Sequence, residues 1–150
     1  MGMPPYPHDI AAELRDVRAM ATDAWTAAQS SARWMPHLPM TFAPVDAALW
    51  PKTAGDAWVG VWQGVVHRQH PRLRLGVWCQ GAAASGQCRV VVDGTAGTAR
   101  SFGEGISRPE FEEALPDGDL NPVTVRIELR RSSGTGTVAC WPLWAYGVES

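Results

Sequence analysis

The pattern of hydrophobic and polar residues changes twice along the chain. In residues 8–31 the apolar positions recur at spacings of four and three, which is typical of one face of a helix. Residues 32–55 are rich in proline and follow no sustained period. From residue 56 onward, apolar and polar residues alternate with period two, as in β-strands with one buried face. The pattern predicts an N-terminal helix (1–31), a Pro-rich arm (32–55) and a β domain (56–150).

The helix is predicted to be amphipathic and similar to one strand of a coiled coil. Asp9 can cap its start, and its body is rich in good helix formers. Its apolar residues occupy the a and d positions of a heptad repeat, where helices of a coiled coil meet. These residues are Ile10, Leu14, Val17, Ala21, Ala24 and Ala28.

Charged residues flank this apolar stripe. With Leu14 at position a, Glu13 falls at position g and Arg18 at the next e, the offset at which neighbouring parallel helices exchange salt bridges. The stripe therefore predicts self-association of the chain. The alternative is a helix packed on its own domain, whose buried face has the same spacing.

The arm combines prolines with large apolar residues, among them Trp34, Phe42 and Trp50. A free, solvated linker would be more polar than this. We expect the arm to lie against a surface, either that of its own domain or that of a neighbouring subunit.

The β domain is predicted to contain six strands separated by Gly-rich breaks, the signature of an antiparallel sandwich or barrel. The candidate strands are 57–66, 72–80, 86–93, 96–103, 122–131 and 136–146. Residues 107–115 fit either one helical turn opened by Pro109 or an irregular edge strand, and their composition favours the helical turn. The predicted class is mainly β: an antiparallel jelly-roll-like β-sandwich, preceded by the amphipathic helix and the Pro-rich arm.

Two Gly-rich segments are expected to form hairpin turns, one near Ala83 and one at residues 132–136. The first turn would place Cys79 opposite Cys88, close enough to form a disulfide under oxidising conditions. The chain has three cysteines without a CxxC spacing, which argues against a zinc site and a complete disulfide framework. A Cys79–Cys88 bridge and buried thiols both remain open, and the thiols are favoured.

Tryptophan is unusually frequent, with eight residues in 150. Trp58 and Trp62 are four apart on a predicted strand and are expected to share a face. They form either an exposed platform on which sugar rings stack, or a buried contact with the arm or a neighbouring protomer, and burial is favoured. Trp141 and Trp144 allow the same two interpretations.

Composition narrows the classes of partner. The net charge of −2 and a pI near 6.0 lack the electropositive footprint of a nucleic-acid-binding protein. No apolar run approaches the roughly 18 residues that span a bilayer. The first ten residues lack the basic region of a secretory signal, so we expect the chain to fold in a cytoplasm.

Motifs for catalysis, metals and cofactors are weak. His67 and His70 have an HxxH spacing on a predicted connection, with no further ligand nearby. A run that imitates a calcium loop has proline where glycine is needed; it consists of Asp117, Asp119, Asn121 and Glu128. The sequence contains no nucleophile elbow, no phosphate loop and no dinucleotide fingerprint. We therefore predict a protein that is not an enzyme and that has no metal and no cofactor.

The order of elements resembles the minor tail proteins of long-tailed bacteriophages that infect GC-rich Gram-positive hosts. The resemblance is carried by the helix DIAAELRDVRAM, the Pro-rich bridge and a compact sandwich ending in VRIELRRSSGTGTVACWPLWAYGV. It implies a virion component of the tail tip or fibre, with three copies around the tail axis. In such an arrangement the helix forms a trimeric stem, contacts other tail proteins and displays the sandwich outward. The family brings no catalytic residues.

The sequence is compatible with two functions. The first is a non-enzymatic structural protein of a phage tail, assembled in the host cytoplasm as a homo-oligomer, with a trimer expected, that contacts glycan on the host surface. The alternative is a stand-alone carbohydrate- or ligand-binding jelly roll whose helix packs on its own sandwich.

Overall fold

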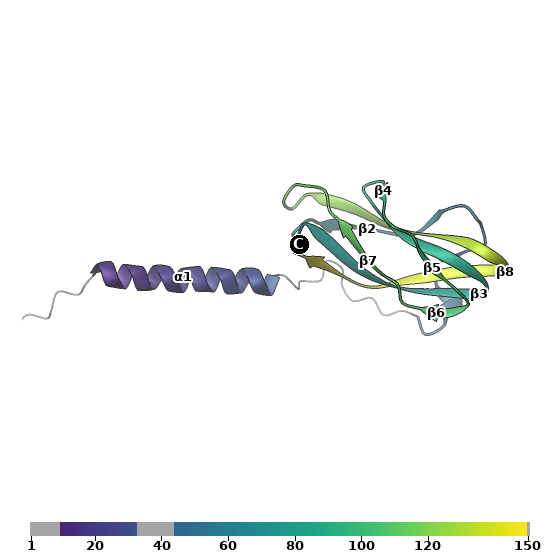
Figure 1. Ribbon diagram of the computed structural model, residues 1–150, viewed down its shortest axis with the longest axis horizontal. Coiled ribbons are helices and arrows are strands. Elements are labelled where there is room, and N and C mark those ends of the chain that lie inside the picture. The colour runs from purple at the N-terminus through teal and green to yellow at the C-terminus, as the bar shows by residue number, and fades with distance from the viewer. Residues whose placement is uncertain (1–9, 33–43, 150) are drawn as a thin grey trace, which may run out of the picture. The chain divides into compact units, whose positions relative to one another are not determined.

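The computed structural model describes residues 10–32 and 44–149, which belong to two compact units. The first unit contains α1 (Ile10–Ala32), with the side chains of residues 11–25 described. The second contains the short 3-10 helix η1 (Ala47–Leu49) and eight strands (Figure 1). The strands are β1 (Lys52–Thr53), β2 (Val59–His67), β3 (Arg72–Val92), β4 (Thr95–Ala96), β5 (Arg100–Phe102), β6 (Gly105–Ser107), β7 (Glu110–Ala114) and β8 (Pro122–Val148). This architecture confirms the predicted class, an antiparallel β-sandwich preceded by one helix.

One long two-stranded ribbon, made of β3 and β8, forms the centre of the sandwich. The two strands are antiparallel over the whole of β3, from the pair Arg72–Val148 to the pair Val92–Val125. The ribbon folds over near its middle (Figure 1). The inward side chains of its two halves meet in one core. The core includes Leu73, Leu75, Val77, Val90, Val123, Val125, Ile127, Leu129 and Val138.

The folded ribbon divides the sandwich into two layers. In the layer that we call the cleft layer, the ribbon halves 72–80 and 137–148 pair with β1, β6 and β7. In the layer that we call the arginine layer, the halves 86–92 and 122–131 pair with β2, β4 and β5.

Small residues make the corner of the ribbon, at 81–86 and 132–137. The pairing register shifts twice at the corner, each time by one extra residue in β8, and Ala83 and Gly134 both have positive φ angles, of 51° and 84°. A Cβ atom at Gly136 would collide with the carbonyl oxygen of Ala82 across the ladder. The absence of a side chain therefore lets the two backbones approach closely enough for the ribbon to bend.

Both predicted hairpin turns are wrong. The segment 132–136 continues within β8, and the residues around Ala83 continue within β3. The ladder partner of Cys79 is Cys140, while Cys88 lies opposite Leu129. The glycine and serine residues at these positions bend β3 and β8 as one paired ribbon. The sequence pattern of the same residues is also that of two separate hairpin turns, in which each chain segment reverses direction.

The helical turn predicted at 107–115 is also wrong. This segment contains the edge strand β7, which pairs with β3 and buries Phe111. Its outward carboxylates form ion pairs with arginines of β3, Glu110 with Arg74 at 2.6 Å and Glu112 with Arg72 at 2.9 Å. Pairing with β3 outweighs the local preference of this acidic segment for a helix.

The described part of the arm lies against its own sandwich. Trp50 is only 3% exposed, and the backbone N–H of Cys140 donates to the carbonyl oxygen of Pro51 at 3.0 Å. Farther along, the N–H of Arg131 donates to the carbonyl oxygen of Gly55 at 2.7 Å. Trp34 and Phe42 fall outside the described residues.

The corner predicts a strong effect of one added methyl group. Gly136→Ala should lower the free energy of unfolding by at least about 2 kcal/mol, because the new Cβ displaces paired backbone. Gly103→Ala is the matched control, since its Cβ would meet nothing within 4 Å, and it should change stability by no more than about 0.5 kcal/mol. Urea unfolding of both variants measures the difference, and equal stabilities would contradict the assigned corner.

Candidate functional site

Within the helical unit taken by itself, the side chains of the apolar stripe of α1 are exposed in the described part of the helix. Leu14 and Val17 are 63% and 57% exposed, and Ala21 and Ala24 are also exposed. The side chains of Ile10 and Ala28 are outside the described residues. Isolated helices of this length are marginally stable in water, so an exposed stripe of this kind favours packing against a partner.

A further large member of this surface is Trp25, which is 67% exposed and which the heptad pattern does not identify. At 3.6 residues per turn, Trp25 lies only about 20° around the helix axis from Leu14. It occupies an e position, so a search restricted to a and d positions passes over it. Glu13 and Arg18, which flank the stripe, are also exposed.

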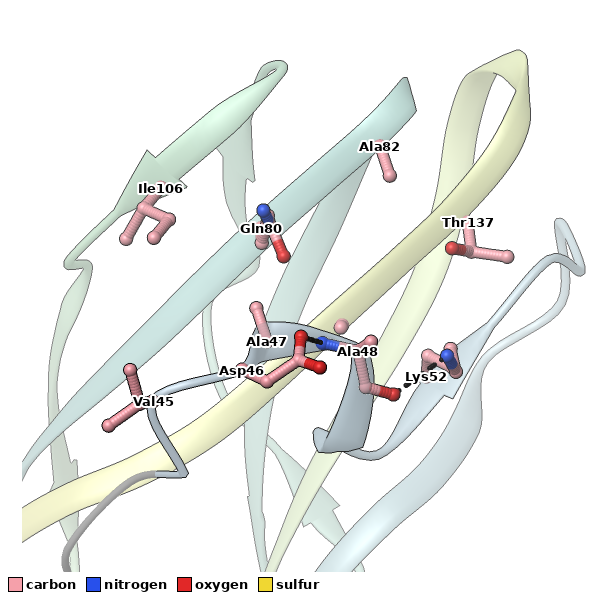
Figure 2. Close-up of a pocket in the computed structure, with 10 residues that line it drawn as sticks. Val45, Asp46, Ala47, Ala48, Lys52, Gln80, Ala82, Ile106 and Thr137 are labelled. Carbon is pink, nitrogen blue, oxygen red and sulfur yellow. Dashed lines mark hydrogen bonds between the residues drawn. The ribbon is translucent and has the colours of Figure 1, made fainter.

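A cleft of about 490 Å³ opens on the outer face of the cleft layer (Figure 2). Its floor consists of small or polar residues of β3 and β8, and its walls are η1 with the preceding residues on one side and β6 on the other. The lining residues are Val45, Asp46, Ala47, Ala48, Lys52, Gln80, Ala82, Ile106, Thr137 and Ala139. This volume is within the range of small-molecule binding sites.

Two polar side chains on the cleft floor are available to a ligand. The amide of Gln80 and the hydroxyl of Thr137 have no hydrogen-bond partner within the described part of the chain. They lie on neighbouring strands (Figure 2), where Gln80 is the ladder partner of Ala139 and Thr137 that of Ala82. Neutral donors and acceptors over a flat apolar floor suit a polyhydroxylated ligand such as a sugar.

The wall of the cleft is held by its own hydrogen bonds. A carboxylate oxygen of Asp46 accepts from the backbone N–H of Ala48 at 2.8 Å, and Lys52 Nζ donates to the carbonyl oxygen of Ala48 at 2.9 Å (Figure 2). Below this wall, the ring of Trp50 stacks on Trp78 with centroids 5.6 Å apart. The indole N–H of Trp50 donates to the carbonyl oxygen of Pro44 at 3.0 Å. Trp50 thus connects the start of the wall to Trp78 of the sheet.

The predicted aromatic residues are distributed over three places. Trp58 and Trp62 do not share a face, because a bulge in β2 between Gly60 and Trp62 reverses the alternation. Trp62 packs against the core, whereas the ring of Trp58 lies 4.2 Å and 4.7 Å from the guanidinium carbons of two arginines.

The two C-terminal tryptophans are partly buried on the cleft layer. Trp141 is the ladder partner of Trp78, next to the cleft. Trp144 lies over Gly76, and its ring centroid is 5.3 Å from that of Tyr146. Trp78 and Trp50, which the sequence analysis did not single out as site residues, are therefore the aromatic residues that support the cleft.

The three cysteines, Cys79, Cys88 and Cys140, are free and fully buried. A thiol hydrogen bond with Cys88, together with burial, raises the pKa of the Cys140 thiol well above its usual value. A thiolate is therefore disfavoured, and the cluster has the character of a packed core.

The histidine and carboxylate motifs have structural partners. His70 is buried with Nδ1 3.3 Å from Glu149 Oε1, whereas His67 is exposed. Arg68 Nη1 donates to Asp119 Oδ1 at 3.0 Å in the turn that resembles a calcium loop. Glu128 is not part of this turn, since it lies in β8 and forms ion pairs there.

Two further features concern metals and membranes. Within residues 10–32 and 44–149, no group of three or more His, Cys, Asp or Glu side chains is arranged to hold a metal ion. In the same residues, no helix has both the length and the apolar character needed to cross a membrane.

The Trp50–Trp78 stack predicts that the cleft wall contributes to stability. Trp50→Ala should lower the free energy of unfolding by about 3 kcal/mol, because it removes a buried indole ring. Leu49→Ala changes the neighbouring residue, which is 70% exposed, and should cost no more than about 0.5 kcal/mol. Chemical unfolding compares the two, and a Trp50→Ala variant as stable as the parent would refute the packing of the arm.

Comparisons with known proteins show the fold alone. No protein-family model matches the chain, and no curated protein matches it. Among solved structures, an insecticidal delta-endotoxin from Bacillus thuringiensis is similar, with a TM-score of 0.50 and 14% sequence identity. The match covers 65% of this chain but only 19% of the endotoxin chain, so the likeness concerns one part of a much longer protein.

Proposed function

We propose that the chain is a non-enzymatic structural protein of a phage tail tip or fibre, in which α1 joins identical copies and the sandwich contacts host-surface glycan. The observation that carries the proposal is the solvent-exposed stripe of α1 around Leu14 and Val17. Exposure of large apolar side chains along a helix marks a surface that gains free energy when a partner covers it.

The partner that we propose for α1 is a second copy of the same helix. Heptad spacing of Leu14, Val17 and Ala21 is the pattern of a helix that packs on others of its kind. In a parallel arrangement, Glu13 of one copy lies beside Arg18 of the next, so the flanking charges of identical helices are complementary. The resemblance to phage tail proteins adds a preference for three copies and for contacts with other tail proteins in the virion.

The sandwich would supply the contact with glycan. Its cleft offers an amide, a hydroxyl and a flat floor, and an oligomer presents several such clefts at once. The overall affinity then exceeds that of a single cleft. Once one cleft has bound, the second and third clefts bind the same surface at a high effective concentration. The alternative, a stand-alone ligand-binding module, uses the same cleft without self-association.

The stripe is tested by two Ala→Glu changes in the same helix. Ala21→Glu places a charge at position a, and the dissociation constant of the oligomer should rise about 100-fold because this charge would be buried. Ala19→Glu is the matched control at position f, on the opposite side of the helix, and should leave assembly unchanged. Size-exclusion chromatography with light scattering measures the masses; equal effects of the two variants, or none, would contradict the proposed interface.

The cleft is tested with a pair of Gln→Leu variants. Gln80→Leu removes the amide from the cleft floor, and affinity for neutral oligosaccharides should fall about tenfold because hydrogen bonds to the sugar are lost. Gln63→Leu makes the same change on an exposed position of β2 in the arginine layer and should not alter affinity.

An oligosaccharide array probed with the full chain identifies the sugar, and calorimetry then compares the two variants. Retained binding in Gln80→Leu, or equal losses in both, would remove the cleft from the proposal. A protein that binds sugar as a monomer at every concentration would favour the stand-alone module.

A further inference from the structure

We propose a second binding site, on the outer face of the arginine layer, for a carboxylate or phosphate group of an anionic glycan. The site is formed by the guanidinium groups of Arg89, Arg126 and Arg130, and we call it the arginine cluster. It uses neither α1 nor the cleft, so it stands or falls independently of the function proposed above.

A buried carboxylate orients two of these arginines. Glu128 is 5% exposed and lies between Arg89 and Arg126. Its Oε2 accepts from Arg89 Nε at 2.8 Å and lies 2.7 Å from Arg89 Nη2, while its Oε1 lies 2.6 Å from Arg126 Nη2. Each guanidinium group is thereby fixed before any ligand arrives, which reduces the entropy that binding costs.

A neutral amide orients the third arginine. Arg130 donates from Nε at 2.8 Å and from Nη2 at 2.6 Å to the side-chain oxygen of Gln87. Gln87 in turn donates to the hydroxyl of Ser101 on β5 at 3.1 Å. The ring of Trp58 lies against the guanidinium groups of both Arg89 and Arg130, which holds the two groups near each other.

The cluster keeps unused donors. Within the described part of the chain, the Nη1 atoms of Arg89, Arg126 and Arg130 have no hydrogen-bond or ion-pair partner. The side chains of Arg89 and Arg126 are 26% and 43% exposed, so a ligand can reach them. Amino groups of oriented guanidinium groups suit an anion with two or more oxygens.

The cluster also has an excess of positive charge. Three guanidinium groups face one carboxylate, Glu128, and no other carboxylate of the described residues lies within ion-pairing distance of them. Two arginines of β3 in the cleft layer differ, because Arg72 and Arg74 each have their own glutamate. A bound anion would therefore neutralise excess positive charge at the arginine cluster. Arg72 and Arg74 in the cleft layer have no such excess, because a glutamate already neutralises each of them.

An anionic glycan fits this site better than a nucleic acid does. The chain as a whole has a net charge of −2, so the positive surface is local and does not extend along a polymer backbone. One patch of three arginines accommodates one or two anionic groups, such as those of a uronic acid or of a sugar phosphate. Trp58 adds partly exposed apolar surface at the edge of the patch.

The test uses the full chain and three oligomers: polygalacturonate for carboxylates, polyglycerol phosphate for phosphates, and dextran as the neutral reference. Calorimetry at about 50 mM salt should detect binding of at least one anionic oligomer and not of dextran. Arg126→Gln should weaken that binding about tenfold, because one charge-assisted contact is lost while Arg89 still pairs with Glu128.

Arg74→Gln is the matched control, since it removes the same charge from the cleft layer and should leave affinity unchanged. The proposal is overturned if neither anionic oligomer binds, if both variants lose affinity equally, or if duplex DNA binds more tightly than either oligomer.

A second measurement on the unaltered chain covers the case in which Arg126→Gln does not fold. Phenylglyoxal modifies accessible arginines, and the modified positions are found by mass spectrometry. The bound anionic oligomer should protect Arg89, Arg126 and Arg130 but leave Arg74 as reactive as before. Unchanged reactivity of the three arginines would equally refute the site.

Discussion

The sandwich depends on the close approach of two backbones at the corner of the β3–β8 ribbon. A side chain at Gly136 would collide with the carbonyl oxygen of Ala82 and push the two paired backbones apart at the corner. Folding at the corner brings Val77 and Val90, on the two halves of β3, into one core. The apolar area removed from water by this closure is the main source of stability, at about 25 cal/mol per Å².

The same fold gives the two outer faces different chemistry. On the cleft layer, outward residues include aromatic rings, the neutral side chains of Gln80 and Thr137, and two arginines each paired with a glutamate, and the arm adds a wall fixed by Trp50. On the arginine layer, the outward residues of the ribbon include three arginines around Glu128. Because the layers are halves of one ribbon, both surfaces are positioned by a single core. A neutral sugar and an anionic group could thus be bound by one sandwich.

Local patterns predicted α1 and the inward alternation of 123–129, because both arise from periodicity within one segment. Other features depend on partners distant in the sequence. The segment around Phe111 forms a strand because it makes backbone hydrogen bonds and ion pairs with β3. Trp58 and Trp62 lie on opposite faces because one bulge in β2 reverses the alternation of side chains between the two faces. The cleft was beyond sequence patterns, since η1, β3, β6 and β8 meet there only after folding.

The central proposal is self-association through α1, which would turn a single sandwich into a multivalent assembly. Sedimentation equilibrium of the unaltered full chain, from about 1 to 100 µM, tests it most directly. The account predicts a species whose mass is a whole multiple of the monomer mass and which dissociates only on dilution. The monomer mass at every concentration would contradict it.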